Sequence, residues 1–279
     1  MQTIGLVAGS GDLPVHVGRE AQGRGFLVVA VAFEGFTNPK IENSASRVCW
    51  LKLGQVGKAI EALKTNGVSR VVMAGKIEKS NLLDLLRLRP DRRALKIIRS
   101  LKDWRDDTIL EAIASELNSE GLTIEEITGW APKLMAPLGV LSRRKPTAEQ
   151  IRDILFGRKM AQGIGALDIG QTVVVKKTSV IAVEAIEGTD RVIRRSAELA
   201  SGCVVVKMAK PNQDMRFDVP GVGPSTIESM IEAKAAALAV EAHKTLLPKK
   251  EEMLELANSK GIVVLGIPSH GDLNTEFLD

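Results

Sequence analysis

The chain has 279 residues, of which 44% are hydrophobic and 26% are charged, the composition of an ordinary globular protein. A single hydrophobic core stops growing at about 250–300 residues, so this length predicts two domains. The net charge of +4 is too small to indicate a nucleic-acid-binding protein. The positive charge is concentrated in residues 76–105, which hold ten Lys or Arg against four Asp or Glu. Such a segment attracts phosphate groups or an anionic membrane surface.

The scarcity of some residue types excludes several classes of function. Six Phe, three Trp and no Tyr leave few rings on which single-stranded bases could stack, so we expect no nucleic-acid partner. The three His and two Cys are dispersed without zinc-ligand spacing, and no histidine lies near a serine that could act as a nucleophile. The sequence shows no export signal and no apolar run long enough to span a membrane. Together with two distant thiols, these features predict a cytoplasmic protein.

The first half of the chain alternates short β-branched runs with helical patterns. Strands are predicted over residues 3–8, 26–33, 47–53 and 69–74, and helices over residues 14–22, 55–66, 81–88, 91–101 and 107–120. Strands separated by helices predict a parallel sheet with right-handed crossovers. We therefore expect an N-terminal α/β domain, built on a parallel sheet, over residues 1–130.

A stretch rich in proline and poor in periodicity comes next, and we interpret residues 131–146 as a linker. An α/β pattern then resumes. Its predicted helices cover residues 147–163, 189–200, 224–243 and 249–260, and its predicted strands cover residues 173–176, 180–184, 203–208 and 262–265. Thr147 and Gln150 have the spacing of a capping box at the start of the first helix. Residues 147–279 are therefore expected to form a second α/β domain, which we take as the catalytic one.

The first candidate binding motif is the turn Gly9-Ser10-Gly11, which directly follows a predicted strand and precedes a predicted helix. Backbone N–H groups in such a turn can approach a phosphate closely, and the helix start adds partial positive charge. Pro14 stands where a dinucleotide fingerprint requires a third glycine. Glu34 ends the second strand, where a ribose-binding acid often lies, so an NAD(P)-dependent oxidoreductase is an alternative. A tight turn that needs glycine for its dihedral angles is another.

The second candidate motif is the segment 183–190, in which a strand leads through Gly188 into a helix. Thr189 or Asp190 could cap that helix, and capping alone would explain both residues. The same turn could instead present N–H groups and a hydroxyl to an anion. Glu184 falls in an otherwise apolar strand, where a carboxylate needs a partner such as a metal ion or a basic side chain.

The third candidate motif is the charged segment 207–220, between a predicted strand and a predicted helix. Polar and apolar residues alternate in its second half, which predicts a short extended piece with Asp214, Arg216 and Asp218 on one side. A solvated charged loop is the alternative interpretation. Carboxylates beside Lys and Arg suit magnesium-assisted cleavage of a pyrophosphate, because the acids hold the cation and the bases neutralise phosphate oxygens.

Four motifs together resemble the LpxI family, whose members are UDP-2,3-diacylglucosamine pyrophosphatases of lipid A biosynthesis. They are AGSGDLP at residues 8–14, ALDIGQTVVV at 166–175, VEAIEGTDRVIRR at 183–195 and KPNQDMRFDVPGVGPSTI at 210–227. The resemblance spans nearly the whole chain. It departs at Ser10, where a glycine is expected, and at Arg191, where a small residue is frequent. It implies an N-terminal Rossmann-like domain, a distinct α/β C-terminal domain and an active site between them.

The resemblance and the charged residues together give a candidate site. The expected catalytic residues are Asp218, Arg216 and Asp214, and the resemblance implies that Asp218 is essential and metal-associated. The expected substrate-binding residues are Gly9, Ser10, Gly11, Leu13, Gly188, Thr189, Asp190, Lys210 and Gln213. The expected cofactor is Mg²⁺ or Mn²⁺, held by Asp218, Asp214 and Glu187.

The expected reaction is hydrolysis of the lipid-linked nucleotide sugar UDP-2,3-diacylglucosamine to UMP and 2,3-diacylglucosamine 1-phosphate. An NAD(P)-dependent oxidoreductase and a nucleotide-sugar-binding module without turnover are the alternatives. The leucines and basic residues of segment 76–105 suggest peripheral contact with the inner leaflet of the inner membrane. The alternative there is a helix pair that packs its leucines inward and leaves its basic residues in water. The family analogy also allows a homodimer.

Overall fold

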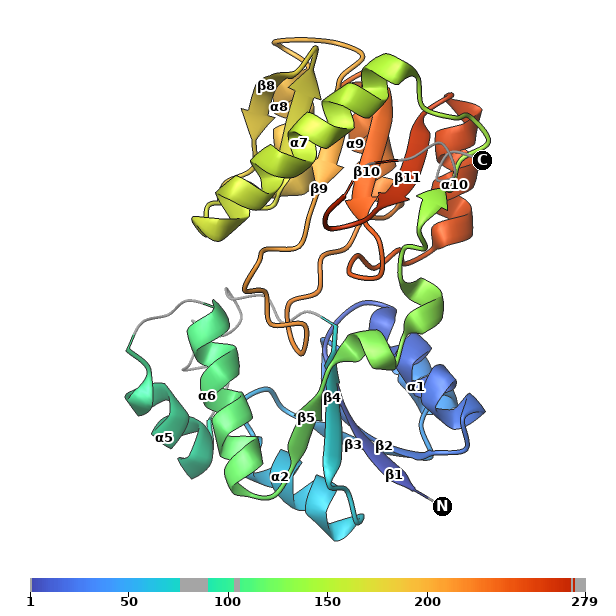
Figure 1. The fold of residues 1–279 in the computed structure, drawn as a ribbon. Helices are drawn as coiled ribbons and strands as arrows, with labels where there is room; N and C mark the ends of the chain where they lie inside the picture. Colours follow the sequence, from blue (N-terminus) through green and yellow to red (C-terminus); the bar gives the residue numbers. More distant parts are fainter. Residues whose placement is uncertain (1, 76–89, 103–105, 272, 274–279) are drawn as a thin grey trace. The chain divides into compact units, whose positions relative to one another are not determined.

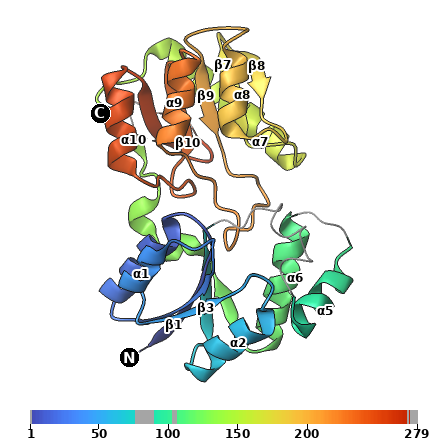
Figure 2. The same cartoon turned by 180° about the vertical axis from the view of Figure 1, so that it is seen from behind.

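The computed structural model describes residues 2–75, 90–102, 106–271 and 273, and it divides into two compact units (Figures 1 and 2). The N-terminal unit contains residues 1–131 together with residues 215–217, and the C-terminal unit contains residues 132–214 and 218–279. Each unit has its own sheet, so the expected α/β class with two domains is confirmed. The helix predicted over residues 81–88 lies outside the described residues.

The N-terminal unit is built on a five-stranded parallel sheet with the order β3-β2-β1-β4-β5. Its strands are β1 (Thr3–Ala8), β2 (Leu27–Phe33), β3 (Arg47–Leu51), β4 (Arg70–Ala74) and β5 (Thr123–Glu125). The four predicted strands are confirmed. The fifth was not predicted, because its three residues are too few to show a periodicity.

Helices cover both faces of this sheet (Figures 1 and 2). They are α1 (Leu13–Gly23), α2 (Val56–Thr65), α5 (Arg92–Ser100) and α6 (Asp106–Ser119), with the 3₁₀ turns η1 (Pro39–Asn43) and η2 (Ile127–Gly129). The apolar face of α2 buries Ile60 and Leu63 in a cluster with strand residues Val29, Val31 and Val71. The strand order therefore reverses between β1 and β4, and the two strands end side by side at one edge.

Close packing of α1 gives a stability prediction. A Cβ on Gly18, inside α1, would lie 2.3 Å from the carbonyl oxygen of Ser44, whereas a Cβ on Gly23 would meet nothing within 4 Å. Ala normally stabilises a helix relative to Gly by about 1 kcal/mol. We expect Gly18→Ala to lose about 1–3 kcal/mol of unfolding free energy through overpacking, and Gly23→Ala to lose none. Urea unfolding of the two variants checks this, and equal effects would contradict the packing.

The C-terminal unit is built on a six-stranded mixed sheet with the order β6-β11-β10-β9-β7-β8. Its strands are β6 (Gly139–Val140), β7 (Thr172–Lys176), β8 (Ser179–Val183), β9 (Val204–Lys207), β10 (Ala237–Glu241) and β11 (Val263–Ile267). The strands β9, β10 and β11 are parallel, while β6, β7 and β8 run antiparallel to their neighbours. The three parallel strands therefore end at one common edge.

Helix α7 (Ala148–Ala166) covers one face of the second sheet, and three helices cover the other (Figures 1 and 2). These are α8 (Thr189–Ser196), α9 (Pro224–Glu232) and α10 (Lys250–Ser259). Thr147 and Gln150 form the predicted capping box of α7. No helix in the described part of the chain is long and apolar enough to cross a membrane.

The prediction of one long helix over residues 224–243 is wrong. The helix ends at Glu232, Lys234 takes a left-handed conformation with φ of 50°, and β10 begins at Ala237. All five residues of β10 are buried between the neighbours β9 and β11. Alanine favours a helix in isolation, but here small side chains fit a central strand with helices on both faces, and tertiary packing overrides propensity.

The segment expected to link the domains, residues 131–146, is folded largely into the C-terminal unit. It contains the 3₁₀ turn η3 (Pro132–Leu134) and the edge strand β6, which pairs with β11. Gly266 of β11 allows this contact, because a Cβ there would lie 1.9 Å from the carbonyl oxygen of Pro137. A two-residue strand between prolines leaves no periodic pattern in the sequence.

Candidate functional site

The predicted N-terminal turn lies where the strand order of the first sheet reverses. Gly9, Ser10 and Gly11 follow β1, and the Gly9 N–H donates to the carbonyl of Ala74 at the end of β4 (2.7 Å). A Cβ on Gly75 would lie 2.5 Å from the Ser10 carbonyl oxygen, so the two strand ends pack closely. Open parallel sheets bind ligands at such reversals, beyond the carboxyl ends of their strands. The turn is therefore at the edge of this unit where a ligand is expected.

The helix that follows the turn begins at Leu13, with Pro14 in its first turn. Asp12 precedes the helix but makes no side-chain capping bond. Its carboxylate accepts instead from the side-chain amide of Asn38 (2.8 Å). The Asp12 side chain therefore accepts no hydrogen bond from the first N–H groups of α1. A helix start that binds an anion needs those N–H groups to donate to the anion.

A chain of polar side chains joins three elements of the C-terminal unit. Glu184 follows β8 and is 7% exposed, and Lys207 ends β9 and is 5% exposed. Thr189, the first residue of α8, connects them. Its hydroxyl donates to Glu184 Oε1 (3.0 Å) and accepts from Lys207 Nζ (2.6 Å). The partner expected for the Glu184 carboxylate is therefore the Thr189 hydroxyl, which also accepts a hydrogen bond from the buried Lys207 ammonium.

The capping interpretation of Thr189 and Asp190 is wrong. The residue that precedes α8 is Gly188, with φ of 83°, and no side chain caps the helix. The hydroxyl of Thr189 is held by Glu184, and the Asp190 carboxylate accepts from the hydroxyl of Thr226 on α9 (3.0 Å). The turn at 188–190 thus keeps the backbone form of an anion-binding helix start, while its side chains are held by other elements.

Glu187 is bound by groups of its own unit. Its carboxylate accepts from the Ala185 N–H (3.0 Å) and from the Arg195 guanidinium (2.8 Å). The hydrogen bond from Arg195 lowers the pKa of Glu187 below its usual value, with a further contribution from backbone N–H groups. The carboxylate therefore stabilises the turn before Gly188.

The predicted site loop after β9 is organised by Gln213. The side-chain oxygen of Gln213 accepts from the Lys210 N–H (2.8 Å), and its amide nitrogen donates to Asp218 Oδ2 (2.6 Å). The Lys210 ammonium is paired with Asp168 Oδ1 (2.6 Å). Three predicted residues, Lys210, Gln213 and Asp218, are thereby brought together. Gln213 acts within this arrangement as a positioning residue for the Asp218 carboxylate.

Residues 214–218 form a turn, so the predicted extended piece is wrong. The Asp218 N–H donates to the Asp214 carbonyl (3.0 Å), which closes the turn. Phe217 packs against the apolar cluster of the N-terminal unit, to which residues 215–217 belong. The guanidinium of Arg216 lies 4.8 Å from the centre of the Phe217 ring. The polar–apolar alternation therefore reflects partial burial of Phe217 and not a strand.

The three carboxylates proposed as metal ligands do not form one cluster. Among the described residues, no group of three or more His, Cys, Asp or Glu side chains could hold a metal ion. Glu187 is held by Arg195, while Asp218 is exposed and has one amide donor. Mg²⁺ is commonly held by one or two carboxylates together with substrate phosphates and water.

Glu241 is a buried residue of this edge that the sequence analysis missed. It ends β10, is 2% exposed, and accepts from the Ala209 N–H (2.8 Å) and from Lys244 Nζ (2.9 Å). The hydroxyl of Ser269 donates to Oε1 of Glu241, the oxygen that Lys244 also binds. Glu241 thus fixes the start of the loop that carries Lys210 and Asp218. The sequence signal that could have identified Glu241 is a charged residue at the end of the apolar run 237–240. This signal was hidden because the run was predicted to be part of a helix.

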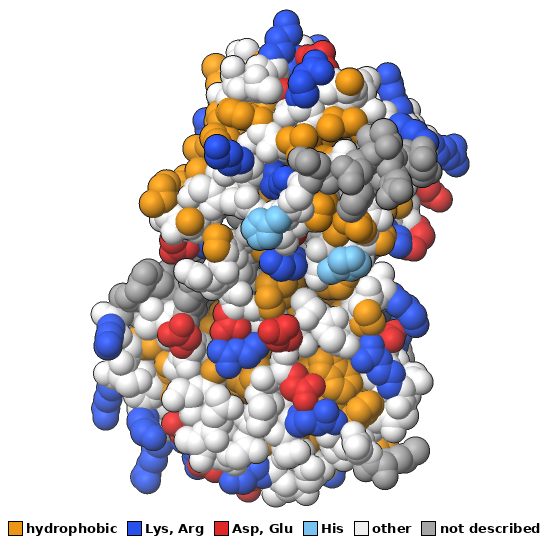
Figure 3. All heavy atoms as spheres, viewed as in Figure 1, with side chains coloured by type: hydrophobic (Ala, Val, Ile, Leu, Met, Phe, Trp, Pro, Cys, Tyr) orange, Lys and Arg blue, Asp and Glu red, His pale blue; other side chains and the backbone are white. Residues whose placement is uncertain are grey.

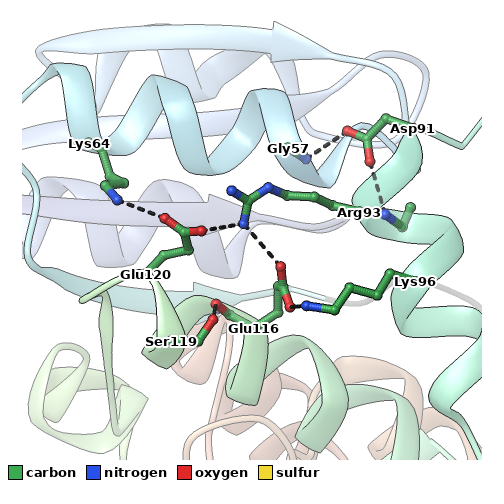
Figure 4. A network of polar contacts seen from close by, with 9 residues as sticks. Gly57, Lys64, Asp91, Arg93, Lys96, Glu116, Ser119 and Glu120 are labelled. Carbon is green, nitrogen blue, oxygen red and sulfur yellow. Dashed lines mark hydrogen bonds and ion pairs between the residues drawn. The ribbon is translucent and has the colours of Figure 1, made fainter.

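The basic segment of the N-terminal unit contains an internal ion-pair network (Figure 4). Arg93 of α5 binds Oε1 of Glu116 on α6 (3.0 Å) and also binds Glu120, the residue directly after α6. Glu120 in turn binds Lys64 of α2 (2.7 Å). Lys96 binds Glu116 (3.3 Å). The hydrogen bond that Arg93 donates to Glu120 raises the pKa of Arg93, and hydrogen bonds from Lys64 and then Arg93 lower the pKa of Glu120. Arg93 therefore ties three helices together.

The network predicts a pH-dependent stability. Because the pKa of Glu120 is lowered by folding, its contribution is present above the unfolded-state pKa and is lost as pH falls through the folded-state value. We expect Glu120→Gln to lower the melting temperature at neutral pH, and we expect the difference from the parent protein to shrink as the pH falls below the ordinary pKa of a glutamate. Thermal melting across this range checks the prediction. A melting difference that is independent of pH would contradict it.

Other basic side chains of this segment face solvent. Arg92, Lys96, Arg99 and Lys102 are exposed, and Leu95, which lies among them on α5, is 38% exposed. Figure 3 shows Lys and Arg side chains projecting along the edge of the N-terminal unit that α5 occupies in Figure 1. In the described part of the segment, Arg93 is thus paired with Glu116 and Glu120, whereas Arg92, Arg99 and Lys102 face solvent. We call these three exposed residues the basic stripe. Its leucines at 82–88 lie outside the described residues.

Comparisons with known proteins match both units. Residues 3–134 match the sequence profile of the LpxI N-terminal domain, and residues 137–265 match that of the LpxI C-terminal domain. The chain is 34% identical over 281 aligned positions to the "UDP-2,3-diacylglucosamine pyrophosphatase LpxI" of Caulobacter vibrioides. The alignment covers 96% of this chain and 98% of that protein.

Solved structures give weaker likenesses. CobK precorrin-6A reductase is 14% identical, with a TM-score of 0.31, over 98% of this chain and 90% of that one. Phosphoribosylglycinamide synthetase from Anaerococcus prevotii is 9% identical, with a TM-score of 0.27, over 73% of this chain. The chain spans less than half of that protein, 44% of its length.

Proposed function

Because this chain belongs to the LpxI family, we propose that it hydrolyses UDP-2,3-diacylglucosamine to UMP and 2,3-diacylglucosamine 1-phosphate in lipid A biosynthesis. In this reaction water adds to one phosphorus of the pyrophosphate and the bridging P–O bond breaks. The observation that supports the proposal best is the identity of 34% over 98% of the relative named for that activity. The site loop that holds Lys210, Gln213 and Asp218 together is consistent with it.

The residues of the loop have distinct proposed roles. Asp218, which Gln213 positions, orients the attacking water or binds a divalent cation. Lys210 and Arg216 neutralise charge that develops on the phosphate oxygens. Mg²⁺ or Mn²⁺, held by Asp218 and Asp214 with substrate oxygens, would polarise the pyrophosphate. In the C-terminal unit, the turn at 188–190 supplies backbone N–H groups for the remaining phosphate charge, and in the N-terminal unit the turn at 9–11 offers N–H groups to a phosphate.

The test of this function is an incubation of purified protein with UDP-2,3-diacylglucosamine and Mg²⁺, followed by chromatography for UMP. The proposal expects UMP that increases with protein concentration and disappears with a chelator. Reduction of NAD(P) without UMP would favour an oxidoreductase built on the Gly9–Gly11 turn. Tight substrate binding without UMP would favour a binding module. Either result would contradict the proposal.

We also propose that the protein works at the inner surface of the cytoplasmic membrane, with the basic stripe of α5 facing anionic lipids. Arg93 and Lys96 are paired with glutamates, so Arg92, Arg99 and Lys102 are the informative positions. Each basic residue near an anionic leaflet contributes about 1 kcal/mol. Converting these three residues to Gln is expected to weaken vesicle binding about a hundredfold.

The vesicle measurement is sedimentation with phosphatidylglycerol-containing vesicles at low and high salt. The matched control converts the exposed Arg143, Lys159 and Lys260 of the C-terminal unit to Gln, which removes the same charge. Binding that falls equally in both variants would show a net-charge effect only. Binding that persists at high salt in all proteins would also contradict the proposal.

A further inference from the structure

Three large apolar side chains stand exposed at one end of the C-terminal unit. Leu167 and Ile169, in the loop after α7, are 72% and 47% exposed, and Ile186, in the turn before α8, is fully exposed. We call these three residues the apolar rim. Single exposed leucines or isoleucines are common on protein surfaces, so their significance depends on whether they are neighbours and on what lies beside them.

The two segments of the apolar rim are in direct contact. A Cβ on Gly170 would lie 2.1 Å from the carbonyl oxygen of Glu184, so the loop after α7 is packed against the end of β8. Two hydrogen bonds also join these segments. The Gln171 N–H donates to the Glu184 carboxylate (3.3 Å), and the Glu184 N–H donates to the Thr172 carbonyl (2.9 Å). Ile169 and Ile186 are therefore one and two residues from this contact. Figure 3 shows hydrophobic side chains gathered over the carboxyl end of α7.

The apolar rim borders the polar groups of the candidate site. Asp168 lies between Leu167 and Ile169 and binds the ammonium of Lys210 (2.6 Å). On the other segment, Glu184 joins the Thr189–Lys207 chain two residues before Ile186. Polar side chains that contact the candidate site and exposed apolar side chains thus lie within a few residues of one another on both segments. This combination fits an amphiphile whose polar part carries phosphate and whose apolar part is a hydrocarbon chain.

We propose that the apolar rim, Leu167, Ile169 and Ile186, binds an acyl chain of the substrate while its pyrophosphate contacts the neighbouring turn and loop. The inference rests on the proposed function, because it requires a diacylated nucleotide sugar. Burying such side chains against a chain removes apolar surface from water on both partners, which gives affinity without any contact to the reacting bond. Acyl-chain length should therefore change binding, whereas turnover of bound substrate should not depend on these residues.

The test compares a rim variant with a matched control. The rim variant is Leu167→Ser with Ile169→Ser and Ile186→Ser. The control is Val180→Ser with Leu199→Ser, which removes two side chains that are 41% and 64% exposed. Val180 lies near the start of β8, away from the end that leads to Ile186, and Leu199 lies after the end of α8. All five positions are exposed, so both variants should melt as the parent protein does. Binding is measured by titration calorimetry without divalent cation, using substrate with long acyl chains and an analogue with short ones.

We expect the rim variant to bind the long-chain substrate at least about tenfold more weakly and the short-chain analogue unchanged, with the control variant like the parent protein. UMP release at saturating substrate should stay within about twofold. Equal weakening for both chain lengths, equal loss in the control, or a change of oligomeric state by light scattering in the rim variant alone would overturn the inference. A parent protein that binds long-chain substrate but releases no UMP would contradict the proposed function and leave the binding result decisive for the rim.

Discussion

Asp218→Ala is expected to lower kcat for UMP release at least about a hundredfold while the protein melts at the same temperature. Asp218 is exposed, and its carboxylate accepts one side-chain bond, from Gln213, so its loss removes little packing. It does not cap a helix, because α9 begins after Gly223. A carboxylate that acts where charge develops in the transition state affects turnover more than binding, and a hundredfold loss corresponds to ~2.7 kcal/mol.

The measurement is a melting curve beside a UMP-release assay for the parent protein, Asp218→Ala and Glu228→Ala. Glu228 is an exposed carboxylate on α9 of the same unit, so its substitution controls for the loss of one negative charge. We expect Glu228→Ala to keep the parent rate. An Asp218→Ala variant that keeps more than about a tenth of the rate, or that melts far earlier than Glu228→Ala, would contradict the catalytic assignment.

Lys207→Met is expected to destabilise the C-terminal unit by about 3 kcal/mol, although methionine is similar in length to lysine. Lys207 is buried, and the substitution leaves the buried Glu184 and Thr189 without the ammonium that completes their chain. Removing one charged member of a buried pair leaves the other uncompensated, which is why such losses exceed those at the surface. Lys260→Met, at an exposed lysine of the same unit, should change stability by less than about 0.5 kcal/mol.

A double-mutant cycle separates the polar chain from simple loss of packing. If Lys207 and Glu184 stabilise each other through Thr189, then Lys207→Met combined with Glu184→Gln should cost about 1 kcal/mol less than the sum of the two single substitutions. Urea unfolding of the four proteins provides the values. Strictly additive losses, or a Lys207→Met loss no larger than that of Lys260→Met, would mean that the chain has no energetic role.

Short-range patterns predicted most of the fold. The strand at 3–8, the strand predicted over 47–53 and observed over 47–51, and the capping box at Thr147 follow from local periodicity and side-chain chemistry. Residues 224–243 show where such reasoning stops. An alanine-rich segment that favours a helix becomes a central strand, because β9 and β11 pair with it on both sides. Pairing partners distant in sequence decide that outcome, and local propensity contains no information on them.

The candidate site divides in the same way. Gln213 and Asp218 belong to one contiguous motif and are hydrogen-bonded in the structure, although the segment between them is a turn and not the extended piece that was predicted. Contacts between distant elements could not be foreseen, among them Lys207 with Thr189 and Glu241 with Ala209. Each of these depends on which strand ends lie side by side at the sheet edge. Sequence reasoning could name Glu184 as a carboxylate in need of a partner, but not which residue supplies it.

The identity of the bond that is broken tests the central claim most directly. Purified protein is incubated with UDP-2,3-diacylglucosamine and Mg²⁺, and both products are quantified by mass spectrometry as the substrate is consumed. Pyrophosphate hydrolysis predicts UMP and 2,3-diacylglucosamine 1-phosphate in equal amounts, with both formed at least about a hundredfold more slowly by Asp218→Ala. Release of UDP with free 2,3-diacylglucosamine would place the cleavage at the glycosidic bond, and that result, like intact substrate, would contradict the proposed function.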